Sequence, residues 1–338
     1  EKIIKPIDRS SIKNVSHNHK NAPTIDDIYG QEQAKRAIQI AVAGRHNILL
    51  SGPPGSGKTM LAKSLKNLLP ALSEDEIVEV TKLHSLGEHT IINNPIVDRP
   101  FRSPHHTASR ASIIGGGSKV QPGEISLAHR GVLFLDELLE YPRTVLESLR
   151  QPLEDHEITV SRANGKFNFP ANFLLVATMN PCPCGFLGDP EKTCICSQNQ
   201  ILNYQKRLSG PLLDRIDLTV SVSRVPHEKL LNNKMSTKSQ QEIFLSEIHK
   251  AYSVQRDRYK CSYRYNNDIS SNSVDKITSI SESAKTFLTN AAKKLDLSTR
   301  SYFKVIKVSR TIADLEGSTS IEITHIAESL QYRQINIG

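Results

Sequence analysis

The residues with the clearest chemistry form the segment Gly-Pro-Pro-Gly-Ser-Gly-Lys-Thr at positions 52–59. This segment follows a short apolar run, 47–51, which predicts a buried parallel strand, and it leads into apolar residues at helical spacing over 60–65. Strand, glycine loop, Lys-Thr and helix form the context in which this pattern binds phosphate. Glycines let backbone N–H groups turn toward phosphate oxygens, and the positive end of the helix faces the same anion. We expect Lys58 to reach the β- and γ-phosphates and Thr59 to ligate Mg²⁺.

The nucleotide expected at this loop is ATP, with further contacts from the segment that enters the domain. That entry segment, 25–31, precedes a predicted helix over 32–42, and in nucleotide-binding domains it commonly packs beside the base. The expected nucleotide-binding residues are Tyr29, Gly30, Pro54, Gly55, Ser56, Gly57, Lys58, Thr59 and Met60. The alternative interpretation is a glycine-rich turn that binds nothing.

Two acids, Asp136 and Glu137, follow the apolar run 131–135. The pattern predicts a buried strand that ends at the carboxyl edge of a parallel sheet, where ligands bind in open α/β folds. Asp136 would hold Mg²⁺ through water, and Glu137 would polarise the attacking water as a general base. An ordinary surface acid pair is the alternative, but the position of the pair downstream of the phosphate loop favours the catalytic interpretation.

Asn180 ends a further predicted strand over 173–179. A polar residue at that strand end would position the water near the γ-phosphate. The plain alternative is an Asn that only caps the strand.

The chain has five cysteines, and four of them lie close together: Cys182, Cys184, Cys194 and Cys196. In a reducing compartment, such clustering indicates a metal before a disulfide. Four thiolates can close a tetrahedral Zn²⁺ site with no open position, so a metal here would be structural. The paired C-x-C spacing is tighter than the usual C-x-x-C, and free thiols or disulfides remain as alternatives.

The elements that must position these groups read as an α/β domain. A second strand is predicted near 77–80, a helix over 144–153 and a final strand over 218–222. Alternation on both sides of Asn-Gly predicts a hairpin over 158–169 with a type I′ turn. The stretch 84–130 has little periodicity, and a loop of that length is usually functional or mobile, with a solvated insertion as the alternative.

Past Val225 the character changes to helical. Helices are predicted at roughly 239–258, 273–280, 282–295, 299–315 and 323–333, with Ser298 offering a cap for the fourth. We therefore predict three parts: a flexible leader or linker over 1–23, a nucleotide-binding domain over 24–224 and a C-terminal helical domain over 225–338.

Length and charge bound the remaining possibilities. The 338 residues can hold roughly two domains, and the formal charge of +8 allows an acidic partner, nucleic acid included. Neither a run of about 18 apolar residues nor a secretory signal pattern occurs, so we expect a cytoplasmic protein with no membrane partner. The chain begins at Glu1, and we expect it to be part of a longer protein.

Several segments together resemble the AAA+ ATPases of the magnesium-chelatase-like group, and within that group the ComM (YifB) family. The segments that carry the resemblance are 52–59, 131–137, 180–185, 209–217, 115–129 and 297–315. The resemblance runs from about Thr24 to Arg333. It implies a three-layer αβα fold with a parallel five-stranded sheet, followed by an all-α helical lid.

The resemblance also implies an activity. Proteins of this family carry an N-terminal Lon-protease-like domain, which we expect to lie outside the present chain. The family's members are hexameric ATP-driven motors that move DNA branch points during natural transformation. The resemblance implies Arg215 as the arginine finger offered to a neighbouring subunit and Arg300 as the second sensor, with Arg207 as a competing finger. The catalytic set is therefore Lys58, Asp136, Glu137, Asn180, Arg215 and Arg300.

DNA contacts are expected from two insertions that would face a central pore, about 84–125 and 157–169. Their basic residues would follow the DNA backbone without reading sequence: Arg102, Arg110, Lys119, Arg162 and Lys166. A second hypothesis keeps the ATPase but has it remodel a protein complex or drive metal insertion, as in magnesium chelatase. A third is a nucleotide-gated binding module without turnover, against which the intact Asp136–Glu137 pair argues.

Overall fold

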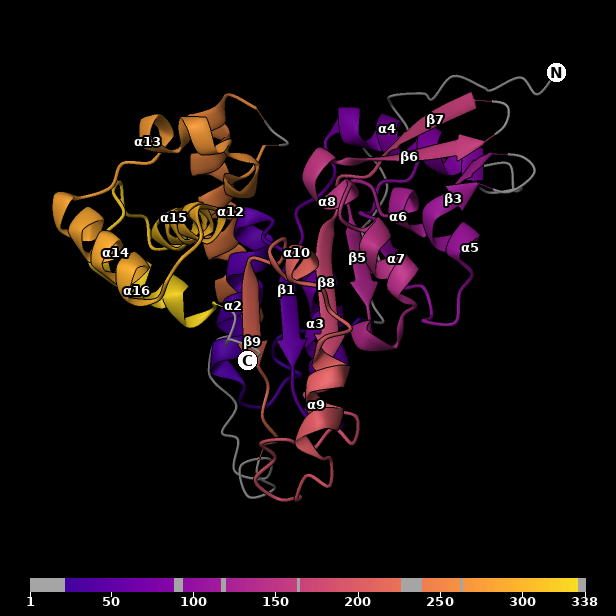
Figure 1. The fold of residues 1–338 in the computed structure, drawn as a ribbon. Helices are drawn as coiled ribbons and strands as arrows, with labels where there is room; N and C mark the ends of the chain where they lie inside the picture. Colours follow the sequence, from indigo (N-terminus) through magenta and orange to yellow (C-terminus); the bar gives the residue numbers. More distant parts are fainter. Residues whose placement is uncertain are drawn as a thin grey trace.

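The computed structural model describes residues 22–87, 94–116, 120–162, 165–225, 239–261 and 264–333 (Figure 1). Its centre is a five-stranded parallel sheet in the order β2-β5-β8-β1-β9. The strands are β2 (Phe101–Arg102), β5 (Val132–Leu135), β8 (Leu174–Met179), β1 (Ile48–Ser51) and β9 (Leu218–Ser221). This confirms the predicted α/β fold class and the strands expected around 47–51, 131–135, 173–179 and 218–222.

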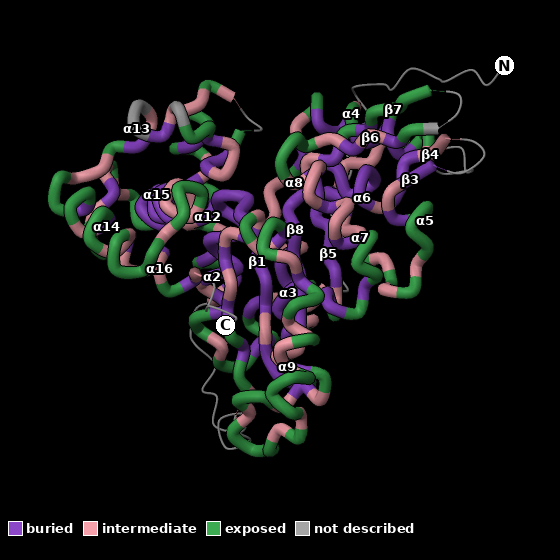
Figure 2. The backbone as a smooth tube through the Cα atoms, in the orientation of Figure 1, coloured by how far each residue is buried: buried purple, intermediate pink, exposed green. Residues whose placement is uncertain are grey.

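The strands β1, β5 and β8 are apolar along almost their whole length, because both faces of the sheet are covered. Side chains that alternate along β1 pack into two different apolar cores, one on each face of the sheet. Ile48 and Leu50 lie in a core with the helices α2 (Glu32–Gly44) and α3 (Lys58–Ser64). Leu49 lies in a second core that includes α7 (Arg143–Ser148). Helices on both faces make the three layers that the resemblance implies, and the strands form the buried centre in Figure 2.

The strand predicted near 77–80 is wrong: these residues lie in the helix α4 (Glu74–Gly87). The backbone N–H of Ser73 donates to Glu76 Oε2 at 3.0 Å, and the N–H of Glu76 donates to Ser73 Oγ at 3.3 Å. This reciprocal pair is a capping box, which starts a helix. Three acids follow in the first turn, where they oppose the positive end of the helix.

The helix predicted over 144–153 is also wrong as a single element. It is divided into α7 and α8 (Pro152–Asp155). Proline has no N–H to donate and its ring clashes with the preceding turn, so the chain starts a new helix at Pro152.

The aperiodic stretch 84–130 holds more structure than a loop. Beyond the end of α4 and β2, it contains α5 (Arg110–Ile114), β3 (Gly115–Gly116), β4 (Gln121–Pro122) and α6 (Glu124–Leu127). The predicted hairpin is confirmed as β6 (Glu157–Arg162) paired antiparallel with β7 (Gly165–Pro170). Its expected type I′ turn, at 163–164, lies outside the described residues, as does most of the predicted leader.

Short helices surround the strand ends. η1 (Leu65–Asn67) extends α3, and η2 (Leu138–Glu140) follows β5. Two more helices, α9 (Gln198–Gln205) and α10 (Gly210–Leu213), lie between β8 and β9. In Figure 1, α10 lies near the start of β1 and α9 near its arrowhead, so the two mark opposite edges of the sheet.

The C-terminal part is helical, as predicted. Its elements are α12 (Gln240–Tyr259), η3 (Asn266–Asp268), η4 (Ser271–Ser273), α13 (Val274–Ile277), α14 (Glu282–Lys294), α15 (Thr299–Leu315) and α16 (Ile323–Gln331). The helix predicted over 273–280 is thus shorter than expected. Ser298 caps α15 as expected, since its side chain accepts from the N–H of Ser301.

The helical part does not stand apart from the sheet. Phe244 and Ile248 of α12 and Ile312 of α15 lie in the same apolar core as α2. The hydroxyl of Tyr252 donates to the carbonyl of Val42 at 2.8 Å. The apolar core therefore runs across the boundary predicted near residue 225. Among the described residues, no helix combines the length and apolar character that crossing a bilayer requires.

Candidate nucleotide-binding site

The glycine loop connects β1 to α3 at the carboxyl edge of the sheet. Gly55 has φ 78° and Gly57 has φ 89°, values that glycine adopts at little cost and other residues rarely adopt. Gly57 is the residue before α3, so the backbone turns sharply into the helix there. The loop therefore has the conformation in which its N–H groups can surround an anion.

Lys58 is buried beneath this loop. Its ammonium donates to the carbonyl oxygens of Gly52 at 2.6 Å and Pro53 at 2.8 Å, and to Asn180 Oδ1 at 3.3 Å. Burial lowers the pKa of Lys58, while the carboxylates of Asp136 and Glu137 oppose that shift. The predicted Lys58 and Asn180 are thus in direct contact, with the charge of the lysine directed at the loop.

Thr59 meets the first of the two acids. Its hydroxyl lies 3.1 Å from Asp136 Oδ2, and the hydroxyl of Thr178 also donates to Asp136. A hydroxyl and a carboxylate are the oxygen ligands that Mg²⁺ prefers. Thr59 and Asp136 therefore fit the predicted magnesium site.

Glu137 has an unusual backbone. Its φ of 53° lies in the left-handed region, where a residue other than glycine is strained and often functional. Its N–H donates to Thr178 Oγ1 at 3.0 Å, which fixes this turn at the end of β5. Its side chain is half exposed, with His106 Nδ1 at 4.0 Å from Glu137 Oε2. This orientation suits a group that must reach a water in the site.

Two residues of this edge, Thr178 and His106, were absent from the sequence-based set. Thr178 is a fully buried polar residue in an otherwise apolar strand, and this was a usable signal. His106 packs edge-on against Tyr141, whose hydroxyl donates to the carbonyl of Pro104. The pair His105–His106 after β2 was visible in the sequence, but its contact with Glu137 depends on tertiary packing.

The residues expected beside the nucleotide base are more exposed than those of the phosphate loop. Tyr29 and Met60 are exposed, with 45% and 38% of their surface accessible. A Cβ added at Gly30 would lie 3.7 Å from Val225 Cγ2, and the side chain of Gln31 donates to the carbonyl of Ser223. The entry segment therefore lies beside the segment that follows β9, and both border the loop edge.

The four clustered cysteines lie next to Asn180. All their sulfur atoms fall within 4.8 Å of one another, which is consistent with a zinc site. Burial raises the pKa of Cys182, whereas backbone N–H groups, that of Phe186 above all, lower the pKa of Cys184 to about 6.

The two predicted arginines lie at the other edge of the sheet. Arg215 comes just before β9, and β9 runs parallel to β1 with Leu218 opposite Ile48. The amino edge therefore carries Arg215, while the loop follows the carboxyl end of β1. Arg300, at the start of α15, lies close by, with Arg300 Nη2 at 3.3 Å from Glu154 Oε1.

Glu154 joins these two guanidiniums. Arg215 forms an ion pair with Glu154 Oε2 and also donates to the carbonyls of Arg150 at 3.1 Å and Pro211 at 2.6 Å. The hydrogen bond from Arg215 lowers the pKa of Glu154. Neither arginine is near the loop of its own chain. The competing candidate, Arg207, lies instead at the loop edge, with Arg207 Nη1 at 3.7 Å from Glu140 Oε2.

The predicted DNA residues are spread over the insertions. Arg110 and Lys166 are exposed, and the β6–β7 hairpin lies beside β3 (Figure 1). Arg102 already forms a two-pronged ion pair with Glu124, at 2.6 and 2.7 Å. Lys119 lies outside the described residues, and only the backbone of Arg162 is described.

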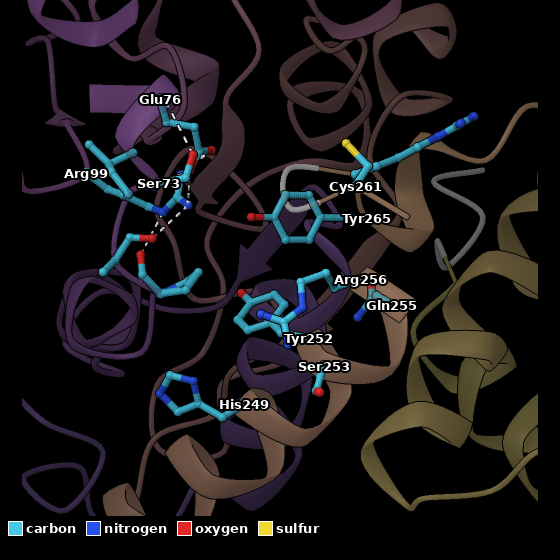
Figure 3. A pocket seen from close by; sticks show the side chains of 14 residues that line it. Ser73, Glu76, Arg99, His249, Tyr252, Ser253, Gln255, Arg256, Cys261 and Tyr265 are labelled. Carbon is cyan, nitrogen blue, oxygen red and sulfur yellow. Dashed lines mark hydrogen bonds and ion pairs between the residues drawn. The ribbon is translucent and has the colours of Figure 1, made fainter. Parts of the chain in front are cut away.

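A cavity of about 300 Å³ lies elsewhere, where α12 meets the segment before α4 (Figure 3). Buried Arg99 pairs there with Glu76 at 3.0 Å and also donates to the carbonyl of Pro70 at 2.8 Å. These charges are matched within the chain, and none of the predicted nucleotide-binding residues lines the cavity. It belongs to the junction between the sheet and the helical part.

Comparison with known families covers almost the whole chain. Residues 24–230 match the family described as "Magnesium chelatase, subunit ChlI", and residues 236–333 match "Magnesium chelatase, subunit ChlI C-terminal". The two matches meet near residue 230, close to the change from sheet to helices.

Individual relatives agree with this. Competence protein ComM of Haemophilus influenzae is 45% identical over 320 residues, 94% of this chain and 62% of that protein. YifB of Escherichia coli is 40% identical over 313 residues, 92% of this chain and 60% of that protein. The magnesium-chelatase 67 kDa subunit of Heliobacterium mobile is 27% identical over 193 residues, 48% of this chain and 28% of that subunit. The chain thus spans about three fifths of the length of the first two relatives. It belongs to the magnesium chelatase ChlI family of AAA+ ATPases, and ComM and YifB are its homologues.

Proposed function

We propose that this chain is the motor part of an ATP-hydrolysing ring of the ComM type, a hexamer that drives branch migration of DNA during natural transformation. The observation that carries the proposal is the division of the catalytic set between two edges of one sheet. Lys58, Thr59, Asp136, Glu137 and Asn180 converge at the carboxyl edge, and Arg215 and Arg300 meet at the amino edge.

The loop edge supplies binding and water activation. Lys58 would exchange its carbonyl partners for phosphate oxygens, and Asn180, which already touches Lys58, would help to orient the attacking water. Glu137 would accept the proton of that water. Mg²⁺, held by Thr59 and Asp136, neutralises phosphate charge when it is bound.

The amino edge supplies positive charge to a neighbour. Because Arg215 and Arg300 are distant from their own loop, they can act on phosphate only across a subunit interface. Arginines supplied from outside a site raise turnover by about 10³–10⁵ in other NTPases. The location of Arg207 beside its own Glu140 supports Arg215 as the finger.

The proposed substrate is DNA. Arg110, Lys166 and the undescribed side chains of Lys119 and Arg162 belong to the two insertions expected at the pore. They would follow the backbone charge without reading bases, so binding should weaken as salt rises. Competence protein ComM, the relative at 45% identity, supports this choice by its name.

A second candidate is remodelling of a protein complex or metal insertion. The match to the ChlI subunit of magnesium chelatase favours it.

A single experiment separates the two functions: ATPase activity of the assembled protein with and without branched DNA, at several salt concentrations. The proposal expects salt-sensitive stimulation by DNA. An assembled ring that hydrolyses ATP but neither binds DNA nor responds to it favours the remodelling function.

A further inference from the structure

The sulfur atoms of the four clustered cysteines have the spacing of metal ligands. Cys182 Sγ lies 3.4 Å from Cys184 Sγ and 3.7 Å from Cys194 Sγ, and the Cys184 and Cys194 sulfurs are 3.6 Å apart. Four sulfurs around Zn²⁺ at about 2.3 Å lie about 3.8 Å from one another in a tetrahedron. A disulfide would need about 2.0 Å. The observed separations therefore match a tetrathiolate site and not bonded pairs.

The fourth sulfur is tied to the others through the backbone. The N–H of Cys184 points at Cys196 Sγ at 3.4 Å, and the N–H of Gly185 donates to the carbonyl of Cys182 at 3.0 Å. Such tight turns orient ligating sulfurs, in the way that outer contacts orient metal ligands generally. Ser197, directly after Cys196, caps α9 with a complete capping box, so the end of the segment is also anchored.

This cysteine segment, 181–197, touches the phosphate loop at Gly185. A Cβ added at Gly185 would lie 2.7 Å from Pro54 Cδ and 3.3 Å from Pro54 Cγ, and the φ of Gly185 is +84°. The backbone of the segment is thus packed on the proline ring of the loop, at a distance only glycine permits. Asn180, which bonds Lys58, is two residues before Cys182.

Arg224 makes a second connection between the two. Its Nη2 donates to the carbonyl of Pro54 at 3.2 Å. Its Nε lies 3.0 Å from Asp189 Oδ2, and its Nη1 lies 3.3 Å from Glu191 Oε2, both in the cysteine segment. Asp189 is itself held by the N–H groups of Glu191 at 2.8 Å and Lys192 at 3.2 Å. One guanidinium thus links the middle of the cysteine segment to the loop.

We propose that Cys182, Cys184, Cys194 and Cys196 bind a structural Zn²⁺, and that the folded metal segment clamps the phosphate loop through Gly185 and Arg224. The metal orders a segment that has little apolar core of its own, and the ordered segment fixes Pro54 and Asn180. Metal occupancy is therefore coupled to nucleotide affinity, although the metal contacts no nucleotide. This inference rests in part on the proposed nucleotide site, so metal and nucleotide are measured separately.

The first measurement concerns the metal alone. The full chain, purified without chelator, should contain stoichiometric zinc, and Co²⁺ in its place should give the absorption of a tetrahedral thiolate site. Cys196→Ser should lose the metal. The matched control is Cys261→Ser, since Cys261 lies on the cavity of Figure 3, away from the cluster. A wild-type chain without zinc that gives no Co²⁺–thiolate band, or whose four thiols are paired as disulfides, overturns the site.

The second measurement is the affinity for a fluorescent ATP analogue. Cys196→Ser should bind it roughly tenfold more weakly, and so should Arg224→Ala, which removes one charged hydrogen bond to the loop but keeps the zinc. Lys192→Ala, in the same segment, and Cys261→Ser should bind as the wild type does. If Cys196→Ser fails to fold, Arg224→Ala and chelation of the wild-type protein give the same comparison.

The outcomes separate the two proposals. Zinc loss with unchanged nucleotide affinity, or Arg224→Ala with wild-type affinity, contradicts the clamp. A zinc-loaded wild-type chain that binds no nucleotide contradicts the proposed function and leaves the metal site intact.

Discussion

The carboxyl and amino edges of the sheet differ in how many of the proposed catalytic residues contact one another there. At the carboxyl edge, two pairs of the proposed residues contact each other within the chain, Lys58 with Asn180 and Thr59 with Asp136. At the amino edge, the two arginines both contact Glu154, and they line a hollow of about 280 Å³ with Lys304 and Lys307. The hollow is also lined by Asp214, Asp217 and Asp268, but neither Asp136 nor Glu137 is among its residues.

This difference supports the proposal that each chain carries two unequal halves of a site. Under the proposed function, the carboxyl edge would bind a nucleotide with residues of one chain. The arginines of the amino edge would act in that function only when a second chain brings its phosphate loop to them. The separation along the strands is fixed by the parallel register of β1 and β9, so no side-chain movement can bring the halves of one chain together.

The largest expected effect comes from removing the charge that crosses the interface. Arg215→Ala should reduce turnover by about 10³-fold or more, because an outside arginine stabilises the transition-state charge. Steady-state ATPase assays on the assembled protein measure this. Mixing Arg215→Ala with Lys58→Ala should recover activity that neither has alone, since some interfaces then join an intact loop to an intact arginine.

Arg207→Ala is the matched control, because Arg207 is an arginine of the loop edge. It should keep most of the activity. If Arg207→Ala is the inactive variant, or mixing restores nothing, the division of the site between edges is wrong.

The next effect concerns the carboxyl edge alone. Glu137→Gln should bind ATP with normal affinity and lose about 10²–10⁴-fold in turnover, the usual contribution of a general base. Nucleotide titration and single-turnover hydrolysis check both halves of the statement. Glu140→Gln, in the neighbouring η2, is the control and should hydrolyse ATP normally. Normal turnover in Glu137→Gln would contradict the assignment of Glu137 as the general base.

The sequence predicted the carboxyl edge better than the amino edge for a physical reason. The loop, the acid pair and Asn180 are each written in a few consecutive residues, and parallel strands must bring their ends together. Errors arose where one local signal masked another. The apolar residues of 77–80 suggest a strand, yet Ile77 and Val80 are three positions apart, as on one face of a helix, and the capping box of Ser73 and Glu76 starts that helix.

The remaining features depend on contacts between distant residues. Glu154 meets Arg215 across 61 positions and Arg300 across 146, and nothing in its neighbours marks it. The approach of Gly185 to Pro54 likewise appears only when the segment after β8 folds onto the loop. Local pattern therefore predicts the half of the site that the chain completes, and packing determines how the other half is held.

A fall in pH should lower the stability of the fold through protonation of His46, which lies at the amino edge. This residue is fully buried between α2 and β1, with Nε2 at 2.8 Å from Thr311 Oγ1 of the helical part. Burial lowers its pKa to about 4, while Asp217 and Asp268 oppose and Lys304 and Lys307 assist that shift. The unfolded chain takes up a proton near pH 6.5 and the folded chain only near 4, so stability is lost as pH falls through this window.

The loss should approach about 3 kcal/mol at pH 4, from the 1.36 kcal/mol that each pKa unit represents. Denaturant unfolding at several pH values measures it. His46→Gln should flatten the dependence, although His129, whose pKa is also lowered to about 4, keeps its own share. Exposed His105→Gln is the control and should leave the slope unchanged. If the unfolding free energy of His46→Gln depends on pH as strongly as that of the wild type, another group is responsible for the acid sensitivity.

The smallest effect tests what Glu154 does for the arginines. It is half exposed, so its pairs should contribute no more than about 1 kcal/mol to folding, and Glu154→Gln should unfold nearly as the wild type does.

In the proposed ring, Arg215 must leave Glu154 to reach a neighbour's phosphate. Removing that competitor should therefore raise ATP-dependent assembly by up to about fivefold, the factor that 1 kcal/mol represents. Sedimentation with and without ATP measures it, and Glu147→Gln, which pairs with Arg150 on the same side, is the control. A Glu154→Gln chain as inactive as Arg215→Ala would instead mean that the carboxylate holds the arginine in its working position, and the amino edge would then be prearranged rather than blocked.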